Sequence, residues 1–230
     1  TGNVTVGGAV TATTYNGIPF FTDAGNKSMY AQDVSSTDNG AAQNTAYGFD
    51  ALAAITTGDD NTAIGHDAGQ ALTQGIQNTL IGSNAGENIT TGDYNVAVGF
   101  EALSTEDGNG TNVAIGYRSL KALNAGAEAY NVAVGYDAGL SVTTGTVNVL
   151  VGAFAGDALT TGRDSVAIGY EALSSEDDGS FNTAVGFRAL KTLNAGADAY
   201  NVAIGYNAGA SVSTGINNTL IGGLAGDALT

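Results

Sequence analysis

The 230-residue chain contains no cysteine, no tryptophan and a single proline. The absence of cysteine excludes disulfides, thiolate nucleophiles and cysteine-rich zinc sites. Basic side chains are also scarce, because 6 Lys and Arg oppose 22 Asp and Glu and leave a formal charge of −16. Such a charge repels phosphate, so the sequence predicts no nucleic-acid partner. No apolar run approaches the roughly 20 residues of a membrane-spanning helix, and we expect no membrane insertion.

Glycine is abundant, with 35 residues, and much of it belongs to one repeated motif. The motif reads Asn, Val or Thr, Ala or Leu, Ile or Val, Gly, aromatic, any residue, Ala, and Gly or Leu. Self-similarity at a fixed period is typical of solenoids. The eleven copies begin at Asn44, Asn61, Asn78, Asn95, Asn112, Asn131, Asn148, Ser165, Asn182, Asn201 and Asn218.

The spacing of these copies defines a second, longer period. The intervals between successive starts are 17, 17, 17, 17, 19, 17, 17, 17, 19 and 17, so that 17+17+17+19 gives a superrepeat of 70. The segment from Asn95, NVAVGFEALSTEDG, accordingly aligns with SVAIGYEALSSEDD from Ser165. We therefore expect an N-terminal β-rich cap or adaptor over residues 1–43, then a solenoid of 11 coils over residues 44–230 that is truncated at its C-terminal end.

The composition of one repeat predicts an all-β fold, a β-solenoid of the β-roll or β-helix type with 17-residue and 19-residue coils. A 17-residue unit is too short for two helices, and its Thr, Gly and β-branched residues favour strands and turns. Side chains alternate along a strand. We expect Val132 and Val134 to fill the interior of the coil, and Ala133 to be covered by identical chains. The apolar residue at the twelfth position predicts a second strand in each coil.

Asparagine and glycine mark the expected turns. The leading Asn tolerates left-handed backbone geometry, and its amide can form a ladder from coil to coil. Glycine at the fifteenth position predicts a left-handed turn into the next coil. These glycines are Gly58, Gly75, Gly92, Gly126, Gly145, Gly162, Gly179, Gly196 and Gly215.

The motif resembles that of a known group of fibrous proteins. NVAIGYNAG from Asn201 and SVAIGYEAL from Ser165 are similar to repeats in the heads of YadA-like trimeric autotransporter adhesins, and the NTAVGF and TTG segments resemble bacteriophage tail-fibre repeats. The resemblance covers residues 44–230 and implies a parallel homotrimer with a role in adhesion or host attachment. It also implies an extracellular location, on a virion or a bacterial cell surface. The autotransporter coils are shorter, which favours the phage fibres.

Few residues suggest chemistry. The single histidine, His66, stands where other repeats have an aromatic residue and has no evident catalytic partner, so we predict no enzyme, no catalytic residue and no cofactor. Acidic residues interrupt the repeat at two corresponding places, where carboxylate oxygens suit calcium. The calcium candidates are Glu106, Asp107, Glu176, Asp177 and Asp178. The alternative interpretation is a solvated acidic bulge.

Two further surfaces remain open on sequence alone. An aromatic column is expected to pack between coils, with stacking on the sugar rings of a glycan receptor as the alternative. Its members are Tyr47, Phe100, Tyr117, Tyr136, Tyr170, Phe187 and Tyr206. Ice binding is a rival function for a flat solenoid, although no unbroken Thr-x-Thr strip is present. The sequence thus favours a stiff fibre segment that attaches to an unidentified cell-surface receptor, with a phage tail fibre ahead of an adhesin head or a cell-surface filament.

Overall fold

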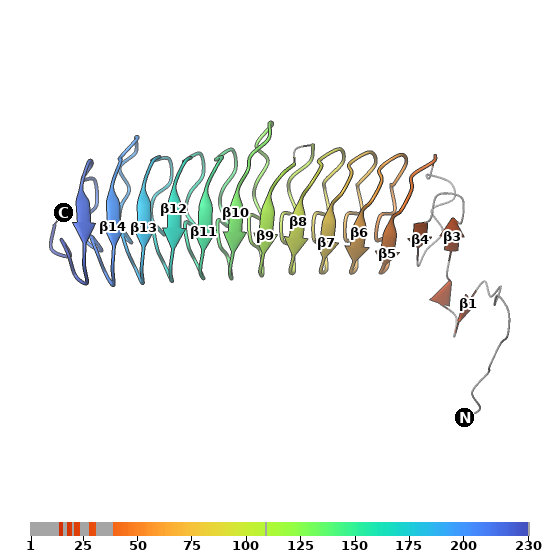
Figure 1. The fold of residues 1–230 in the computed structure, drawn as a ribbon, viewed down its shortest axis with the longest axis horizontal. Coiled ribbons are helices and arrows are strands. Elements are labelled where there is room, and N and C mark those ends of the chain that lie inside the picture. The colour runs from red at the N-terminus through yellow and green to blue at the C-terminus, as the bar shows by residue number, and fades with distance from the viewer. Residues whose placement is uncertain are drawn as a thin grey trace, which may run out of the picture.

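The chain forms a rod of stacked β-coils (Figure 1). This computed structural model describes residues 39–108 and 110–229, together with the backbone of four short strands between residues 14 and 30. Strands β5 to β15 contribute one three-residue strand per coil and pair in parallel with their neighbours. At about 4.8 Å per strand, eleven coils extend about 50 Å. The expected all-β solenoid is confirmed, with one strand in each coil instead of two.

These strands follow the repeat closely. Each covers the second to fourth residues of its motif, where the β-branched residues lie. Their bounds are β5 Thr45–Tyr47, β6 Thr62–Ile64, β7 Thr79–Ile81, β8 Val96–Val98, β9 Val113–Ile115, β10 Val132–Val134, β11 Val149–Val151, β12 Val166–Ile168, β13 Thr183–Val185, β14 Val202–Ile204 and β15 Thr219–Ile221.

Four short strands precede the solenoid. They are β1 Thr14–Tyr15, β2 Ile18–Pro19, β3 Phe21–Asp23 and β4 Ser28–Tyr30. Strand β1 pairs antiparallel with β2, and β3 pairs antiparallel with β4, which in turn pairs in parallel with β5. The rest of the cap or adaptor expected over residues 1–43 falls largely outside the described residues, so its boundary stays a prediction.

The interior of the coil holds the small residue of each strand, not the β-branched ones. Ala133 is fully buried, whereas Val132 and Val134 on either side are only partly buried. The expectation that Val132 and Val134 fill the interior is therefore wrong. The coil is too narrow for a β-branched layer on the strand side, because leucine and isoleucine from the opposite wall, such as Leu123 and Ile89, already occupy the centre.

Size complementarity in this core follows the 70-residue superrepeat. Leu150 replaces the usual strand alanine, and glycine stands at the ninth position of the same coil, Gly156, and of the preceding coil, Gly139. A Cβ atom added to Gly156 or Gly139 would lie only 2.7 or 2.8 Å from a methyl group of Leu150. The same arrangement recurs around Leu80 and Leu220, each one superrepeat away. The superrepeat is therefore a packing pattern that crosses the boundary between coils.

The leading asparagines form the expected ladder along the interior. In Asn148 the backbone N–H donates to Oδ1 of Asn131 at 2.9 Å, and Oδ1 accepts from the N–H of Ser165 at 3.1 Å. The amide group also crosses its own coil, because Nδ2 of Asn148 donates to the carbonyl of Gly162 at 2.9 Å. Asn148 is fully buried. The ladder prediction is confirmed, with backbone groups as the partners.

Left-handed backbone geometry occurs at other positions than expected. The residue before each leading Asn or Ser has positive φ, as in Val147 (60°) and Tyr94 (60°), whereas the leading residues themselves do not. Among the nine fifteenth-position glycines, only Gly126 and Gly196 have positive φ. Gly58, Gly75 and Gly145 are required by close approach instead: a Cβ on Gly145 would lie 2.4 Å from the carbonyl oxygen of Gly162.

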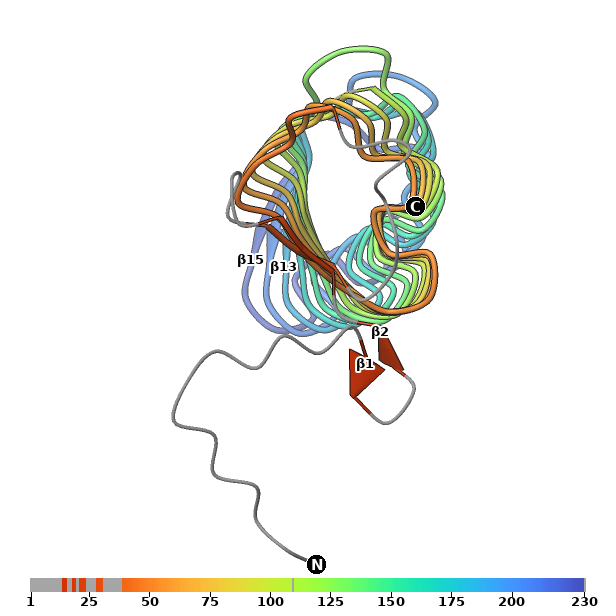
Figure 2. The same ribbon diagram turned by 90° about the vertical axis from the view of Figure 1, so that its right-hand side faces the viewer.

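The two 19-residue coils are visible as loops that stand out from the rod. Figure 2 looks along the rod and shows one green and one blue loop beyond the outline of the other coils. Residues 124–128 and 194–198 form these loops, and most of their side chains are exposed. Both lie on the same side of the rod, four coils apart.

Candidate interaction surface

An apolar strip runs along the outside of the sheet. The second and fourth residues of each motif point outward, and most of them are Val, Ile or Thr. Isoleucines at the fourth position are well exposed, for example Ile64 at 39%, Ile115 at 37% and Ile168 at 38%. The strip is continuous from β5 to β15. Exposed apolar surface of this extent is unusual for a soluble monomer and indicates an interaction site.

A column of aromatic rings borders the strip, one residue beyond the glycine of most motifs. Seven rings follow one another without interruption, with centroids 5.0 to 5.9 Å apart. They belong to Phe100, Tyr117, Tyr136, Phe154, Tyr170, Phe187 and Tyr206. Phe154 comes from the next position of its own motif and contacts its neighbours edge-on. The column therefore packs between coils, as expected.

The first coil differs from the sequence assignment, which placed Tyr47 in the aromatic column. Tyr47 ends strand β5 and belongs to the apolar strip, whereas Phe49 occupies the aromatic position. Phe49 stacks on His66 at 5.8 Å, and Nδ1 of His66 lies 2.9 Å from Asp67 Oδ2. The prediction that His66 is a surface substitution in this column is consistent with its 57% exposed side chain.

The stacking geometry decides how the column can bind. Interplanar angles are 14° for Phe100 on Tyr117 and 8° for Tyr117 on Tyr136, so neighbouring rings cover one another's faces. A sugar ring stacks on a free aromatic face. In this column mainly the edges are open, which argues against a glycan platform.

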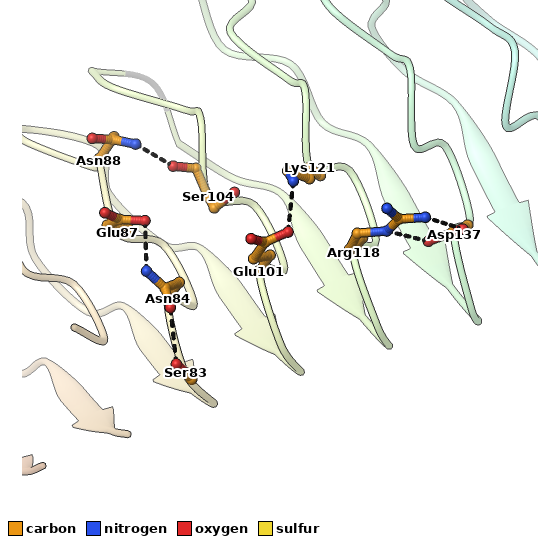
Figure 3. Close-up of polar contacts among 9 residues, drawn as sticks. All are labelled: Ser83, Asn84, Glu87, Asn88, Glu101, Ser104, Arg118, Lys121 and Asp137. Atoms are coloured by element: carbon orange, nitrogen blue, oxygen red, sulfur yellow. Dashed lines mark hydrogen bonds and ion pairs between the residues drawn. The ribbon is translucent and has the colours of Figure 1, made fainter. Parts of the chain in front are cut away.

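Ion pairs reinforce the two long coils, and Figure 3 shows those of the first. Lys121 Nζ lies 2.6 Å from Glu101 Oε2, and Arg118 binds both carboxylate oxygens of Asp137 at 2.9 and 2.6 Å. In the second long coil Lys191 makes the equivalent bond to Glu171 at 2.6 Å, but Arg188 also binds Glu171, at 2.8 Å, and Asn207 stands where the first long coil has Asp137 as its neighbour. Hydrogen bonds from Lys191 and then Arg188 hold the pKa of Glu171 below its usual value.

The calcium candidates do not converge. Glu106 and Glu176 are fully buried in the core, while Asp107 and Asp178 are exposed and Asp177 is partly exposed. Within the described residues, no group of three His, Asp or Glu side chains comes together to hold a metal ion. Asp178 Oδ1 instead accepts from the hydroxyls of Thr160 and Thr161, both at 2.7 Å, and these bonds lower its pKa.

Glu176 performs a structural task that the sequence analysis missed. Its Oε1 accepts from the N–H of Gly179 at 2.9 Å, and Oε2 accepts from the N–H of Ala195 at 3.2 Å. Ala195 lies at the base of the protruding loop in the next coil. The available signal was that both acids at the twelfth position, Glu106 and Glu176, directly precede a 19-residue coil.

Comparison with known proteins identifies no relative of this chain. No protein-family model matches the chain, and no curated protein and no solved structure matches it. The described part of the chain contains no helix long and apolar enough to cross a membrane.

Proposed function

We propose that this chain is a non-enzymatic, structural segment of an extracellular or virion fibre, in which three parallel copies pack through their apolar strips. A phage tail fibre is the favoured context, and a trimeric autotransporter head or another cell-surface filament is the alternative. The observation that carries the proposal is the continuous outward strip of mostly β-branched side chains along the rod. Receptor contacts are assigned to the two protruding loops or to another part of the fibre.

The size of the strip suits an assembly in which the bordering aromatic column takes part. Three residues at about 3.3 Å each make the strip about 10 Å wide, so that a length of about 50 Å gives about 500 Å². A standard specific interface buries about 800 Å² on each partner, which is more than the strip alone provides. Parallel chains related by rotation about the long axis would bring equivalent coils to the same height. A three-fold axis is taken from the family resemblance.

Native mass and particle shape test the proposal together. Light scattering and electron microscopy of residues 1–230 should give an elongated particle of about three times the 22.7 kDa chain mass. A monomeric rod at micromolar concentration would contradict it.

Ice binding is the second candidate, and one observation favours it. The outward strip repeats Thr or Val with Ile or Val at the spacing of parallel strands, as in Thr62 with Ile64 and Thr79 with Ile81. A monomeric rod with strong thermal hysteresis would support this candidate against the fibre. A trimer without thermal hysteresis would exclude it.

A further inference from the structure

Two stacked tyrosines stand out within the aromatic column. The rings of Tyr117 and Tyr136 lie 5.0 Å apart at an interplanar angle of 8°. They form the one tyrosine-on-tyrosine contact among the ring contacts of the described residues, because every other tyrosine in a stack meets phenylalanine. Their exposures of 40% and 48% leave both rings accessible to reagents in solution.

Neighbouring contacts hold the two rings together. Strands β9 and β10 are paired in register, so that Ile115 lies opposite Val134 two residues before each tyrosine. The Arg118 guanidinium lies 5.0 Å from the centroid of the Tyr117 ring and is bound by Asp137, the residue after Tyr136. Groups fixed side by side react as if at very high local concentration. A reactive species formed on one ring therefore meets the other before it meets another chain.

We propose that Tyr117 and Tyr136 are a site of oxidative dityrosine cross-linking by a one-electron oxidant of the haem-peroxidase class. Each phenol loses one electron to the oxidant and one proton to water, which gives two phenoxyl radicals. The radicals form one carbon–carbon bond between ring carbons ortho to the hydroxyls. Each coupled carbon then releases its hydrogen, and both phenols are restored. Overall the two tyrosines lose two hydrogen atoms, and one hydrogen peroxide is reduced to two waters.

This bond would give the rod a covalent link that its sequence otherwise lacks. The chain has no cysteine and therefore no disulfide. The cross-link would join the coil that begins at Asn112 to the coil that begins at Asn131, and would close the chain between the two tyrosines into a loop. Closing a loop restricts the unfolded chain and so stabilises the fold. The inference is independent of the proposed trimer, because both rings belong to one chain.

The test treats the dilute folded chain with a haem peroxidase and a stoichiometric amount of hydrogen peroxide. Dityrosine fluorescence, mass on a denaturing gel and peptide mass spectrometry are then measured. The variants are Tyr117→Phe and Tyr136→Phe, with Tyr170→Phe as the matched control in the same column. Phenylalanine already occupies this position at Phe100 and Phe187, so all three variants should fold.

The expected product is a monomer that carries a 117–136 linked peptide two hydrogens lighter than its parts. Tyr117→Phe and Tyr136→Phe should each abolish that peptide, whereas Tyr170→Phe should retain it in full. Phe187→Tyr should add a second link to Tyr170 or Tyr206, since both rings already contact Phe187. A wild-type chain without the 117–136 peptide, or cross-links mainly between chains, would overturn the proposal.

Discussion

Individual residues in this solenoid accept conformations that are costly for their type. Val147 is a β-branched residue with φ of 60°, at a position where other coils have Asn217, Asp164 or Asp60. A left-handed conformation costs about 1–2 kcal/mol for an ordinary L-residue, and less for asparagine, whose short polar side chain bonds locally. Val147 is 48% exposed, so little packing compensates for this cost.

Val147→Asn should therefore stabilise the rod by about 1 kcal/mol. Chemical denaturation monitored by circular dichroism measures the change in the free energy of unfolding. The reverse exchange in the same column, Asn217→Val, is the control and should destabilise. A loss of stability in Val147→Asn would show that the valine side chain makes a contact worth more than the backbone strain.

Asp157 links stability to pH. Burial raises its pKa to about 6, and the negative charges of Asp137 and Glu171 add to the effect. Its Oδ1 atom is buried without a hydrogen-bond partner among the described residues. Because the folded-state pKa lies above the unfolded value, the favourable contribution of the neutral carboxyl is complete below about pH 4 and disappears as the pH rises through about 6.

Asp157→Asn should accordingly stabilise the chain at pH 7.5 and change little at pH 3.5. The side chain is partly exposed, so solvent screening reduces the gain at pH 7.5 to about 1 kcal/mol. Denaturation curves at the two pH values measure the difference. An equal effect of the substitution at both values would contradict the role of the charge.

At the residue scale the sequence was informative where one residue type recurs in nearly every coil. The leading Asn was recognised as a ladder because it recurs in ten of the eleven coils. The left-handed positions were missed, since residues as different as Tyr94, Val147 and Asp164 occupy them and no type marks the conformation. At these positions the fold determines the left-handed backbone conformation, whatever conformation the side chain would prefer.

Each coil depends on its neighbours for its core. Leu150 fills the space above Gly139 and Gly156, so Leu150→Ala should leave a cavity that two coils share. Such truncations cost about 2–5 kcal/mol. The double variant Leu150→Ala with Gly156→Leu reproduces the pairing of Ala167 with Leu173 in the next coil and should recover part of the loss.

Thermal and chemical denaturation of the single and double variants measure this coupling. Additive losses in the double variant would mean that the two positions do not share one space. This exchange of large and small residues was present in the sequence. It escaped notice because the strand position was assigned to the wrong face of the sheet, which separated Leu150 from the glycines that it contacts.

The protruding loop at residues 194–198 rests on a buried carboxylate. Glu176→Gln keeps one acceptor but places an NH2 group against the N–H of Gly179 or Ala195. An unmade bond of this kind costs about 1–3 kcal/mol. We therefore expect hydrogen exchange around Ala195 to accelerate by about tenfold or more. Residues 124–128, the corresponding loop of the other long coil, are the internal control. Equal exchange around Ala195 in wild type and variant would refute the anchoring role.

At the scale of the whole molecule, the proposed trimer depends on the apolar strip along the sheet. A lysine at Val134 or Ile168 would place a charge in the middle of the apolar strip, and burial of an unpaired charge is strongly unfavourable. Val134→Lys with Ile168→Lys should convert the proposed trimer to monomers while the circular dichroism spectrum is unchanged. Thr144→Lys, at an exposed position outside the strip, is the matched control. Retention of the trimer in the double variant would assign the contact to another face.

The sequence predicted the stacked-coil architecture better than it predicted which residues lie on the surface. The 17-residue period was sufficient to predict stacked coils, because a unit of that length is too short for two helices and its composition favours strands and turns. The strip was not predicted, since the alternation of Val132, Ala133 and Val134 is apolar on both faces and periodicity alone does not say which face is inside. The narrow interior resolves this ambiguity in favour of alanine.

The shared space around Leu80, Leu150 and Leu220 also constrains how such a protein changes length. Near-identical blocks in a gene recombine with one another, and each unequal exchange adds or removes a block. A second copy of the coil that begins at Asn148 would place another leucine next to Leu150 in the stack, whereas a step of one whole superrepeat preserves every contact. We therefore expect natural length variants to differ by whole blocks of four coils, about 19 Å of rod. Each added block would carry one more protruding loop on the same side.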